Sequence, residues 1–87
     1  MAMATIHKFE ILSWDFVISA GSLQILSVGI DPKGVPCIWG RVNTEGKKAL
    51  TYIKIFGTGD EIPTDVNLIF LGTVIHLGYV WHVFKEN

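Results

Sequence analysis

Short apolar runs separated by turn residues constrain this chain of 87 residues more than any other feature of its sequence. Within the runs, Val, Ile, Thr and aromatic residues alternate with polar ones, which is typical of half-buried strands. Turn residues recur every ~10–13 positions, and no long stretch keeps a helical period. The pattern predicts an all-β fold, either a compact antiparallel sandwich or a small barrel of about seven short strands.

The predicted strands occupy most of the sequence and leave no room for a second domain. They are Thr5–Leu12, Trp14–Ser19, Leu23–Ile30, Pro36–Asn43, Ala49–Phe56, Leu68–Ile75 and Tyr79–Lys85. We therefore expect a single β domain over residues 4–87, with residues 1–3 as a disordered start or a cloning scar.

Two connecting segments carry specific information. The segment Asp31–Gly34 has Asp first, Pro second and Gly fourth, which is the order of a type I turn and predicts a hairpin between its flanking strands. The segment Gly57–Asp65 is the longest irregular stretch, and a single helical turn is expected around Ile62–Val66.

Alternation assigns the residues of each strand to its two faces. Leu26, Val28 and Ile30 are predicted to share one face, with Ser27 and Gly29 on the other. The corresponding set in the next strand is Ile38, Gly40 and Val42, opposite Cys37, Trp39 and Arg41.

The composition is too apolar for a chain of this length to bury by itself. Hydrophobic residues make up 49% of the chain and charged residues only 17%, against roughly 25% charged in an average domain. Domains this short bury only about 60–65% of the surface of the unfolded chain. An apolar surface that contacts a partner is therefore expected, most simply in a homo-oligomer; the alternative is a monomer with scattered apolar exposure.

Charge and cysteine content exclude several classes of protein. The net charge is −1, which argues against nucleic-acid binding because such binding needs a basic face. No run approaches the roughly 18–20 apolar residues of a membrane helix, and no signal peptide is present. Cys37 is the single cysteine, so it is expected to pack as a small hydrophobe in a reducing, cytoplasmic compartment.

The usual elements of catalytic and metal sites are missing from the sequence. His7, His76 and His82 have no ligand spacing typical of a metal site, although His76 and His82 flank one turn with Asp60 or Glu61 as a third candidate ligand. No strained nucleophile motif and no carboxylate pair in an apolar setting is present. We expect no enzyme activity, no catalytic residue, no metal and no cofactor.

The segment Gly57-Thr58-Gly59 has two possible roles. Its glycines allow backbone N–H groups to converge on a phosphate, with the Thr58 hydroxyl beside them. However, Asp60 and Glu61 follow directly and would repel an anion. A tight turn with a positive φ at one glycine is the favoured interpretation.

Aromatic and polar residues on two strands form a second candidate binding surface. Trp39 and Arg41 share a strand face, and Trp81 and His82 are adjacent on a strand that is a candidate neighbour. Indoles beside Arg can stack on nucleobases, including those of single-stranded nucleic acid. The alternative is packing in the core or between subunits, because Trp is the largest apolar side chain.

Three pairs of sequence blocks follow one another in a specific order and spacing. They are Ile25–Val28 with Gly34–Trp39, Gly57–Gly59 with Ile62 and Pro63, and Leu71–Gly72 with Tyr79–Phe84. Together they resemble a family of small uncharacterised phage and prophage proteins, whose pattern is G-x-P-C-[LI]-W, then GTG-x-x-[IV]-P, then a terminal [VF]-W-H-V-F strand. This chain has Gly40 where the family usually has Ala, and Asp60 where His is common. The resemblance implies a viral accessory protein in the infected cell and implies no chemistry.

The sequence thus predicts a non-enzymatic, phage-encoded accessory binding protein that acts in the host cytoplasm. Its expected role is to antagonise host defence by binding a host protein or a small nucleotide-type ligand, a step that rests on analogy. The alternative is a structural or virion-associated self-assembly protein that uses its edge strands and its apolar surface.

Overall fold

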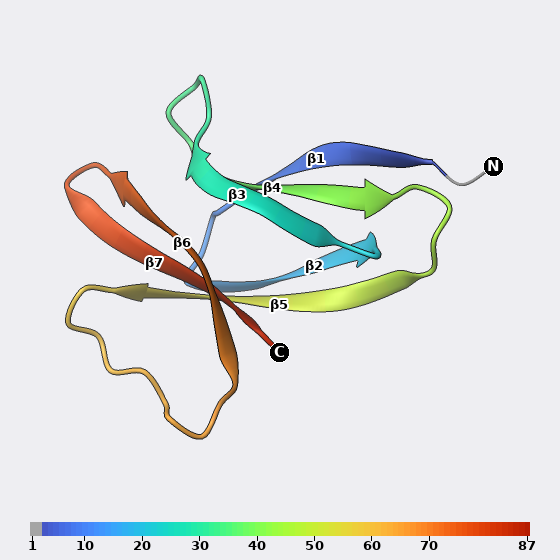
Figure 1. Ribbon diagram of the computed structural model, residues 1–87. Helices are drawn as coiled ribbons and strands as arrows, with labels where there is room; N and C mark the ends of the chain where they lie inside the picture. Colours follow the sequence, from blue (N-terminus) through green and yellow to red (C-terminus); the bar gives the residue numbers. More distant parts are fainter. Residues whose placement is uncertain (1–2) are drawn as a thin grey trace.

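Seven antiparallel strands form two packed sheets in the computed structural model, which describes residues 3–87 (Figure 1). The strands are β1 (Ala4–Glu10), β2 (Asp15–Gly21), β3 (Gln24–Ile30), β4 (Pro36–Asn43), β5 (Lys48–Gly57), β6 (Leu68–His76) and β7 (Tyr79–Glu86). One sheet has the order β1-β4-β3 and the other β2-β5-β7-β6. The predicted all-β fold is confirmed as a sandwich, and no strand end differs from its predicted position by more than two residues.

The predicted helical turn around Ile62–Val66 is wrong. Residues 3–87 contain no helix, and Thr64 and Asp65 form a simple turn within the loop between β5 and β6. One isolated helical turn fixes several backbone dihedrals for a single hydrogen bond, so it is unstable without tertiary packing. The side chains of this loop are exposed and do not provide that packing. No helix in the described residues is long and apolar enough to cross a membrane.

The predicted start segment falls mostly outside the described residues, because residues 1 and 2 are not among them. Met3 is described, and its carbonyl oxygen accepts hydrogen bonds from the backbone N–H and the Oγ1 hydroxyl of Thr44, at 3.0 and 3.1 Å. These bonds attach the chain immediately before β1 to the turn that follows β4.

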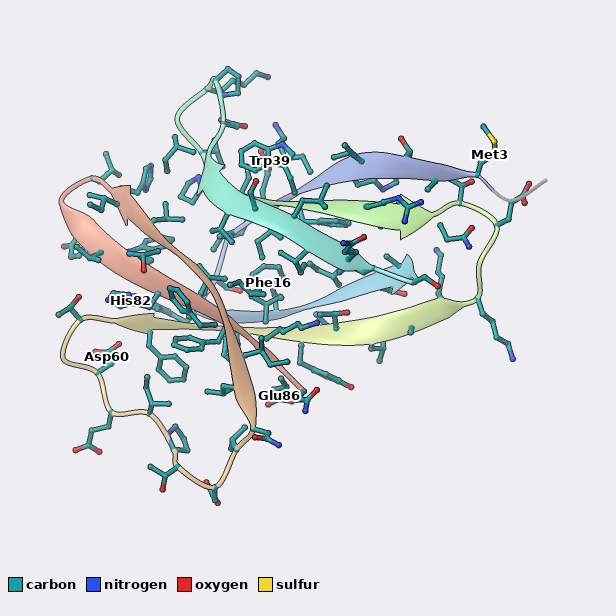
Figure 2. All side chains as sticks on the ribbon, in the orientation of Figure 1. Met3, Phe16, Trp39, Asp60, His82 and Glu86 are labelled. Carbon is teal, nitrogen blue, oxygen red and sulfur yellow. The ribbon has the colours of Figure 1, made fainter. Side chains whose placement is uncertain are left out.

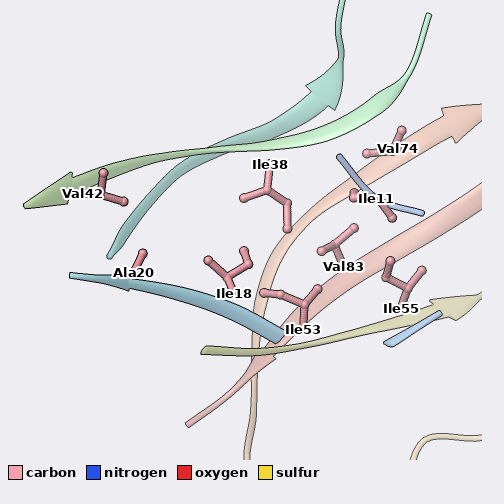
Figure 3. Packing of buried hydrophobic residues seen from close by; sticks show 9 residues of the cluster. All are labelled: Ile11, Ile18, Ala20, Ile38, Val42, Ile53, Ile55, Val74 and Val83. Carbon is pink, nitrogen blue, oxygen red and sulfur yellow. The ribbon is translucent and has the colours of Figure 1, made fainter. Parts of the chain in front are cut away.

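A single apolar layer fills the space between the two sheets (Figure 3). Ile38 of β4, Ile53 of β5 and Val83 of β7 are fully buried at its centre. The buried cluster consists of Ile11, Ile18, Ala20, Ile38, Val42, Ile53, Ile55, Val74 and Val83. Strands with period-two alternation place one face in this layer and the other in solvent, so each sheet has only one covered face.

A bulge in β3 changes its predicted faces. The pairing of β3 with β4 shifts between Ile25 and Ser27, and the extra residue reverses the phase of the alternation. Ile25 and Val28 therefore both pack against the core, whereas Leu26 is 46% exposed. The prediction that Leu26 shares a face with Val28 is wrong for this reason, and Ile30 is also exposed, at the end of the strand. In β4 the predicted set Ile38, Gly40 and Val42 does share one face, which is buried.

The two sheets approach each other along one side of the sandwich and remain apart along the other. On one side β3 lies beside β6, and the missing side chain of Gly72 permits this approach because a Cβ there would lie 3.2 Å from the Cβ of Val28. On the other side, neither β1 nor β2 has a partner along its outer edge within residues 3–87. The sheet does not close into a barrel.

Asp31 connects the predicted hairpin turn to strand β1. Its Oδ1 accepts hydrogen bonds from the backbone N–H groups of Lys33 and Val35, each at 2.9 Å, and its Oδ2 accepts one from Lys8 Nζ at 2.7 Å. The N–H of Gly34 donates to the Asp31 carbonyl oxygen, and Gly34 has a φ of 85°. The hairpin between β3 and β4 is thus confirmed, and its turn is attached by an ion pair to the edge strand of the sheet.

The same contacts control the protonation of this carboxyl group. The hydrogen bond from the Lys8 ammonium, together with the two backbone donors, lowers the pKa of Asp31 from 3.8 to about 2. A carboxyl group whose pKa is lower in the folded chain stabilises the fold above its ordinary pKa and loses that effect as the pH falls through the folded value.

We predict that the stability of the native chain falls more steeply between about pH 4 and pH 2 than that of the Asp31→Asn variant. At neutral pH the variant should be the less stable of the two, because it lacks the carboxylate that Lys8 contacts. Urea denaturation at several pH values measures both effects. Asp15→Asn is the control, since this side chain is 72% exposed and lies 3.6 Å from its lysine; an equal loss in both variants would contradict the role of Asp31.

Candidate functional site

The structure does not assemble Trp39, Arg41 and Trp81 into one stacking surface. Strands β4 and β7 belong to different sheets, so they are not neighbours. Trp39 and Arg41 lie on the outer face of the three-stranded sheet, where a ring atom of Trp39 approaches Gly29. Trp81 lies on the inner face of the four-stranded sheet and packs against the core. Figure 2 shows Trp39 above β4, well separated from His82 on β7.

The segment Gly57-Thr58-Gly59 forms a tight turn rather than an open cradle. The N–H of Asp60 donates to the Gly57 carbonyl oxygen at 3.1 Å, and the N–H of Gly57 donates to Asp60 Oδ2 at 2.8 Å. Gly59 has a φ of 93°, a conformation that glycine adopts at no steric cost. Because the carboxylate of Asp60 occupies the position that an anion would need, the geometry supports the interpretation as a turn.

His82 is held by two threonine hydroxyl groups on the outer face of the four-stranded sheet. Its Nε2 lies 2.9 Å from Thr58 Oγ1, and its Nδ1 lies 3.0 Å from Thr73 Oγ1. One nitrogen of a neutral imidazole donates and the other accepts, and a hydroxyl group can do either. Both ring nitrogens are therefore engaged, and neither contacts a carboxylate that would orient the ring for acid–base chemistry.

The three histidines do not converge. His76 is paired with Tyr79 and lies edge-on to Trp81, with ring centroids 5.9 Å apart, whereas His82 faces the opposite side of the sheet. His7 lies on β1, in the other sheet, 6.1 Å from the ring of Phe9. Within residues 3–87, no group of three or more histidine, cysteine or acidic residues is placed to hold a metal ion.

The best candidate binding site is a hollow at the end of the sandwich where β5 ends and the β6–β7 hairpin turns. We call it the end hollow; its volume is about 450 Å³. It is lined by Trp14, Gly57, Thr58, Asp60, Gly78, Tyr79, Val80 and Trp81. Figure 1 shows the end of β5 and the β6–β7 turn at the same end of the molecule. Aromatic side chains from two separate segments thus meet at one opening.

Two features of the end hollow point to a ligand. The indole rings of Trp14 and Trp81 are stacked at a tilt, with centroids 5.5 Å apart. The Nε1 of Trp81 is buried and has no hydrogen-bond partner among residues 3–87. A buried polar group without a partner costs free energy, so an acceptor from a bound molecule would stabilise this site.

The electrostatics of the end hollow disfavour anions. Asp60 is the only charged residue in its lining, and the next residue along the chain, Glu61, is also acidic. A neutral ring with hydrogen-bond donors, or a cation, fits this lining better than a phosphate. Trp14 and Tyr79 were not among the predicted site residues, although Tyr79 lies two residues before Trp81 and therefore on the same face of its strand.

Cys37 is not a reactive nucleophile. Its side chain is fully buried, and its Sγ donates to the Val35 carbonyl oxygen at 3.2 Å. Burial raises the pKa of the thiol above its ordinary value, which lowers the fraction of the reactive thiolate. The predicted packing of Cys37 as a small hydrophobe is confirmed.

Leu77 marks the tip of the β6–β7 hairpin beside the end hollow. It is 82% exposed and has a φ of 52°, which is rare for a bulky residue. It precedes Gly78, which also has a positive φ, where hairpins of this kind favour Asn followed by Gly. The chain has an exposed leucine at a position where Asn would make the fold more stable.

Comparison with protein families gives one match: a family described as a domain of unknown function, DUF7352, matches residues 3–87. Comparison with curated proteins and with solved structures gives no match.

We predict that Leu77→Asn raises the free energy of unfolding by about 1 kcal/mol, because Asn tolerates the left-handed conformation better than Leu. Urea denaturation measures the change. Leu12→Asn is a matched control, since Leu12 is 81% exposed and has no positive φ; its stability should change little. Equal effects of the two substitutions would show that Leu77 carries no backbone strain.

Proposed function

The chain belongs to the DUF7352 family of domains of unknown function, and we propose that it is a non-enzymatic binding protein whose ligand occupies the end hollow. We further propose that it is a phage-encoded accessory protein that acts in the host cytoplasm and antagonises host defence. The resemblance to phage and prophage proteins supports the viral setting, and the absence of a readable catalytic motif in the sequence supports a binding role.

The aromatic lining of the end hollow carries this proposal. A planar base can stack on the exposed indole of Trp14 or the ring of Tyr79, which are 57% and 67% exposed. Its donor groups can reach Asp60, whose Oδ1 receives no hydrogen bond from the described part of the chain. Trp81 Nε1 is buried and unpartnered, so it gains an acceptor if the indole turns toward the bound base. A small nucleotide-type ligand therefore fits through its base, with its phosphates directed away from Asp60; a host protein is the second ligand class.

We predict that a base-bearing ligand quenches the tryptophan fluorescence of the native chain and that Trp14→Ala weakens its binding by at least about fivefold, since base–aromatic stacking contributes about 1–3 kcal/mol. Titrations with nucleosides, mononucleotides and cyclic dinucleotides, confirmed by calorimetry, measure this. Trp39→Phe, on the other sheet, is the control and should bind normally. Failure of every compound to bind, or binding unaffected by Trp14→Ala, would contradict the proposed site.

A structural or virion-associated role is a second candidate, and the unpaired edge of β1 favours it. Ile6, on this strand, is 62% exposed, and Met3, directly before it, is 57% exposed. An uncovered strand edge is a template for pairing with another chain. Open self-assembly would use this edge and needs no ligand in the end hollow.

Mass spectrometry of purified particles separates the two candidates. An accessory binding protein should be absent from virions or present only in traces. A number of copies comparable to that of known structural proteins would favour self-assembly and count against the accessory role.

A further inference from the structure

The outer face of the four-stranded sheet is apolar over most of its extent. Paired residues of antiparallel strands project to the same side, so the register places Phe56 beside His82 and Lys54 beside Phe84 on this face. Its apolar residues are Val17, Leu50, Tyr52, Phe56, Leu68, Phe70, Ile75, Val80 and Phe84. We call this surface the outer sheet face. Five of these residues are at least 44% exposed. The solvated face of an antiparallel sheet usually carries polar side chains instead.

Three phenylalanines form a cluster near the centre of the outer sheet face. Phe84 lies edge-on to Phe56 and to Phe70, with ring centroids 5.7 and 5.4 Å apart. Phe70 remains 57% exposed. Aromatic rings gathered in this way are typical of the buried centre of a protein interface, where a few residues provide most of the binding energy. The cluster thus has the character of an interface centre.

We propose that a second copy of this chain covers the outer sheet face, in a two-fold symmetric dimer. A two-fold interface uses the same surface on both subunits, so the surface must be complementary to itself. The outer sheet face meets this requirement in its charges.

The charges at the two ends of β5 are complementary. Lys47 and Lys48 stand at its beginning, whereas Asp60, Glu61 and Asp65 follow its end, in the loop between β5 and β6. In Figure 1 this loop lies on the side of the four-stranded sheet away from β1 and β3. A two-fold axis perpendicular to β5 would place the basic end of one copy opposite the acidic end of the other.

The charges at the centre of the outer sheet face are neutralised within one chain. Lys54 Nζ lies 3.6 Å from Asp15 and 4.0 Å from Glu86. A second copy would therefore cover a lysine that already has two acidic partners, and it would avoid the cost of burying an unpaired charge. A phospholipid surface is a worse fit, because anionic headgroups would meet the acidic loop.

The available area sets the expected strength of the dimer. Strands spaced ~4.8 Å apart with a rise of ~3.3 Å per residue give the four strands a footprint of roughly 500 Å². Stable interfaces bury about 800 Å² per partner, and transient ones bury less. The side chains and the loop add to the strand footprint. We expect a dissociation constant in the micromolar range, so the dimer should be observable at moderate protein concentration.

Sedimentation equilibrium of the native chain and of two variants tests the proposal. The native chain should reach twice the 9.7 kDa of one chain as its concentration rises. Phe70→Lys and Leu50→Lys should each remain at 9.7 kDa, because each places a charge in the interface. Both side chains are at least 57% exposed, so the fold should tolerate the changes, which circular dichroism verifies; Leu50→Lys alone decides the test if Phe70→Lys fails to fold.

Ile6→Lys is the matched control, since Ile6 is 62% exposed on the other sheet, and this variant should dimerise like the native chain. The proposal is overturned by a native chain that stays monomeric, by an assembly larger than two copies, or by dimers that survive both interface substitutions. Loss of the dimer in Ile6→Lys would instead assign the interface to β1.

Charge reversal tests the orientation of the two copies. Lys48→Glu and Glu61→Lys should each weaken the dimer several-fold at low salt, because each pairs like charges across the interface. The double variant restores the opposite charges and should recover the native dissociation constant. A double variant weaker than either single variant would overturn the antiparallel orientation. None of the substituted residues lines the end hollow, so the dimer and the proposed ligand site are tested separately.

Discussion

A single apolar layer between two sheets is the constraint on which the rest of this structure depends. A chain of 87 residues forms strands for one such layer, and residues 3–87 contain no further strand or helix to cover the outer faces of the sheets. Each strand therefore directs half of its side chains away from the core. Because nearly half of the residues are hydrophobic, the outward positions cannot all be polar. The hydrophobic side chains that the core does not bury must therefore lie on the surface.

The exposed hydrophobic side chains are distributed unequally between the two sheets. On the outer face of the three-stranded sheet, Lys8, Glu10 and Arg41 supply charge, and the ion pair of Lys8 with Asp31 secures the hairpin turn. On the outer face of the four-stranded sheet, three phenylalanines meet around Phe84. This contrast suggests that the two faces have different roles: one is solvated, and the other is available for association.

The fold was largely predictable because strand and turn signals are local. The Asp31–Gly34 turn and the ends of all seven strands follow from residue types and alternation. The bulge in β3, which turns Leu26 outward, has no equally clear local signal, because it depends on pairing with β4. The assignment of β4 and β7 to different sheets is also a tertiary property, so the predicted meeting of Trp39 and Trp81 was wrong. The contact between Thr58 and His82, which belonged to two separate predicted surfaces, was not predicted, because it depends on the pairing of β5 with β7. The contribution of Trp14 to the end hollow depends on the crossover between the sheets, which the sequence does not reveal.

If exposed apolar side chains gather on the outer sheet face, as we propose, a second copy covers this face in solution. Backbone amide chemical shifts recorded by nuclear magnetic resonance over a dilution series test this claim residue by residue. We expect concentration-dependent shifts in β5, β6 and β7, around Tyr52, Phe70 and Phe84, with little change in β1 and β3. Shifts that are independent of concentration, or that are confined to the three-stranded sheet, would contradict it.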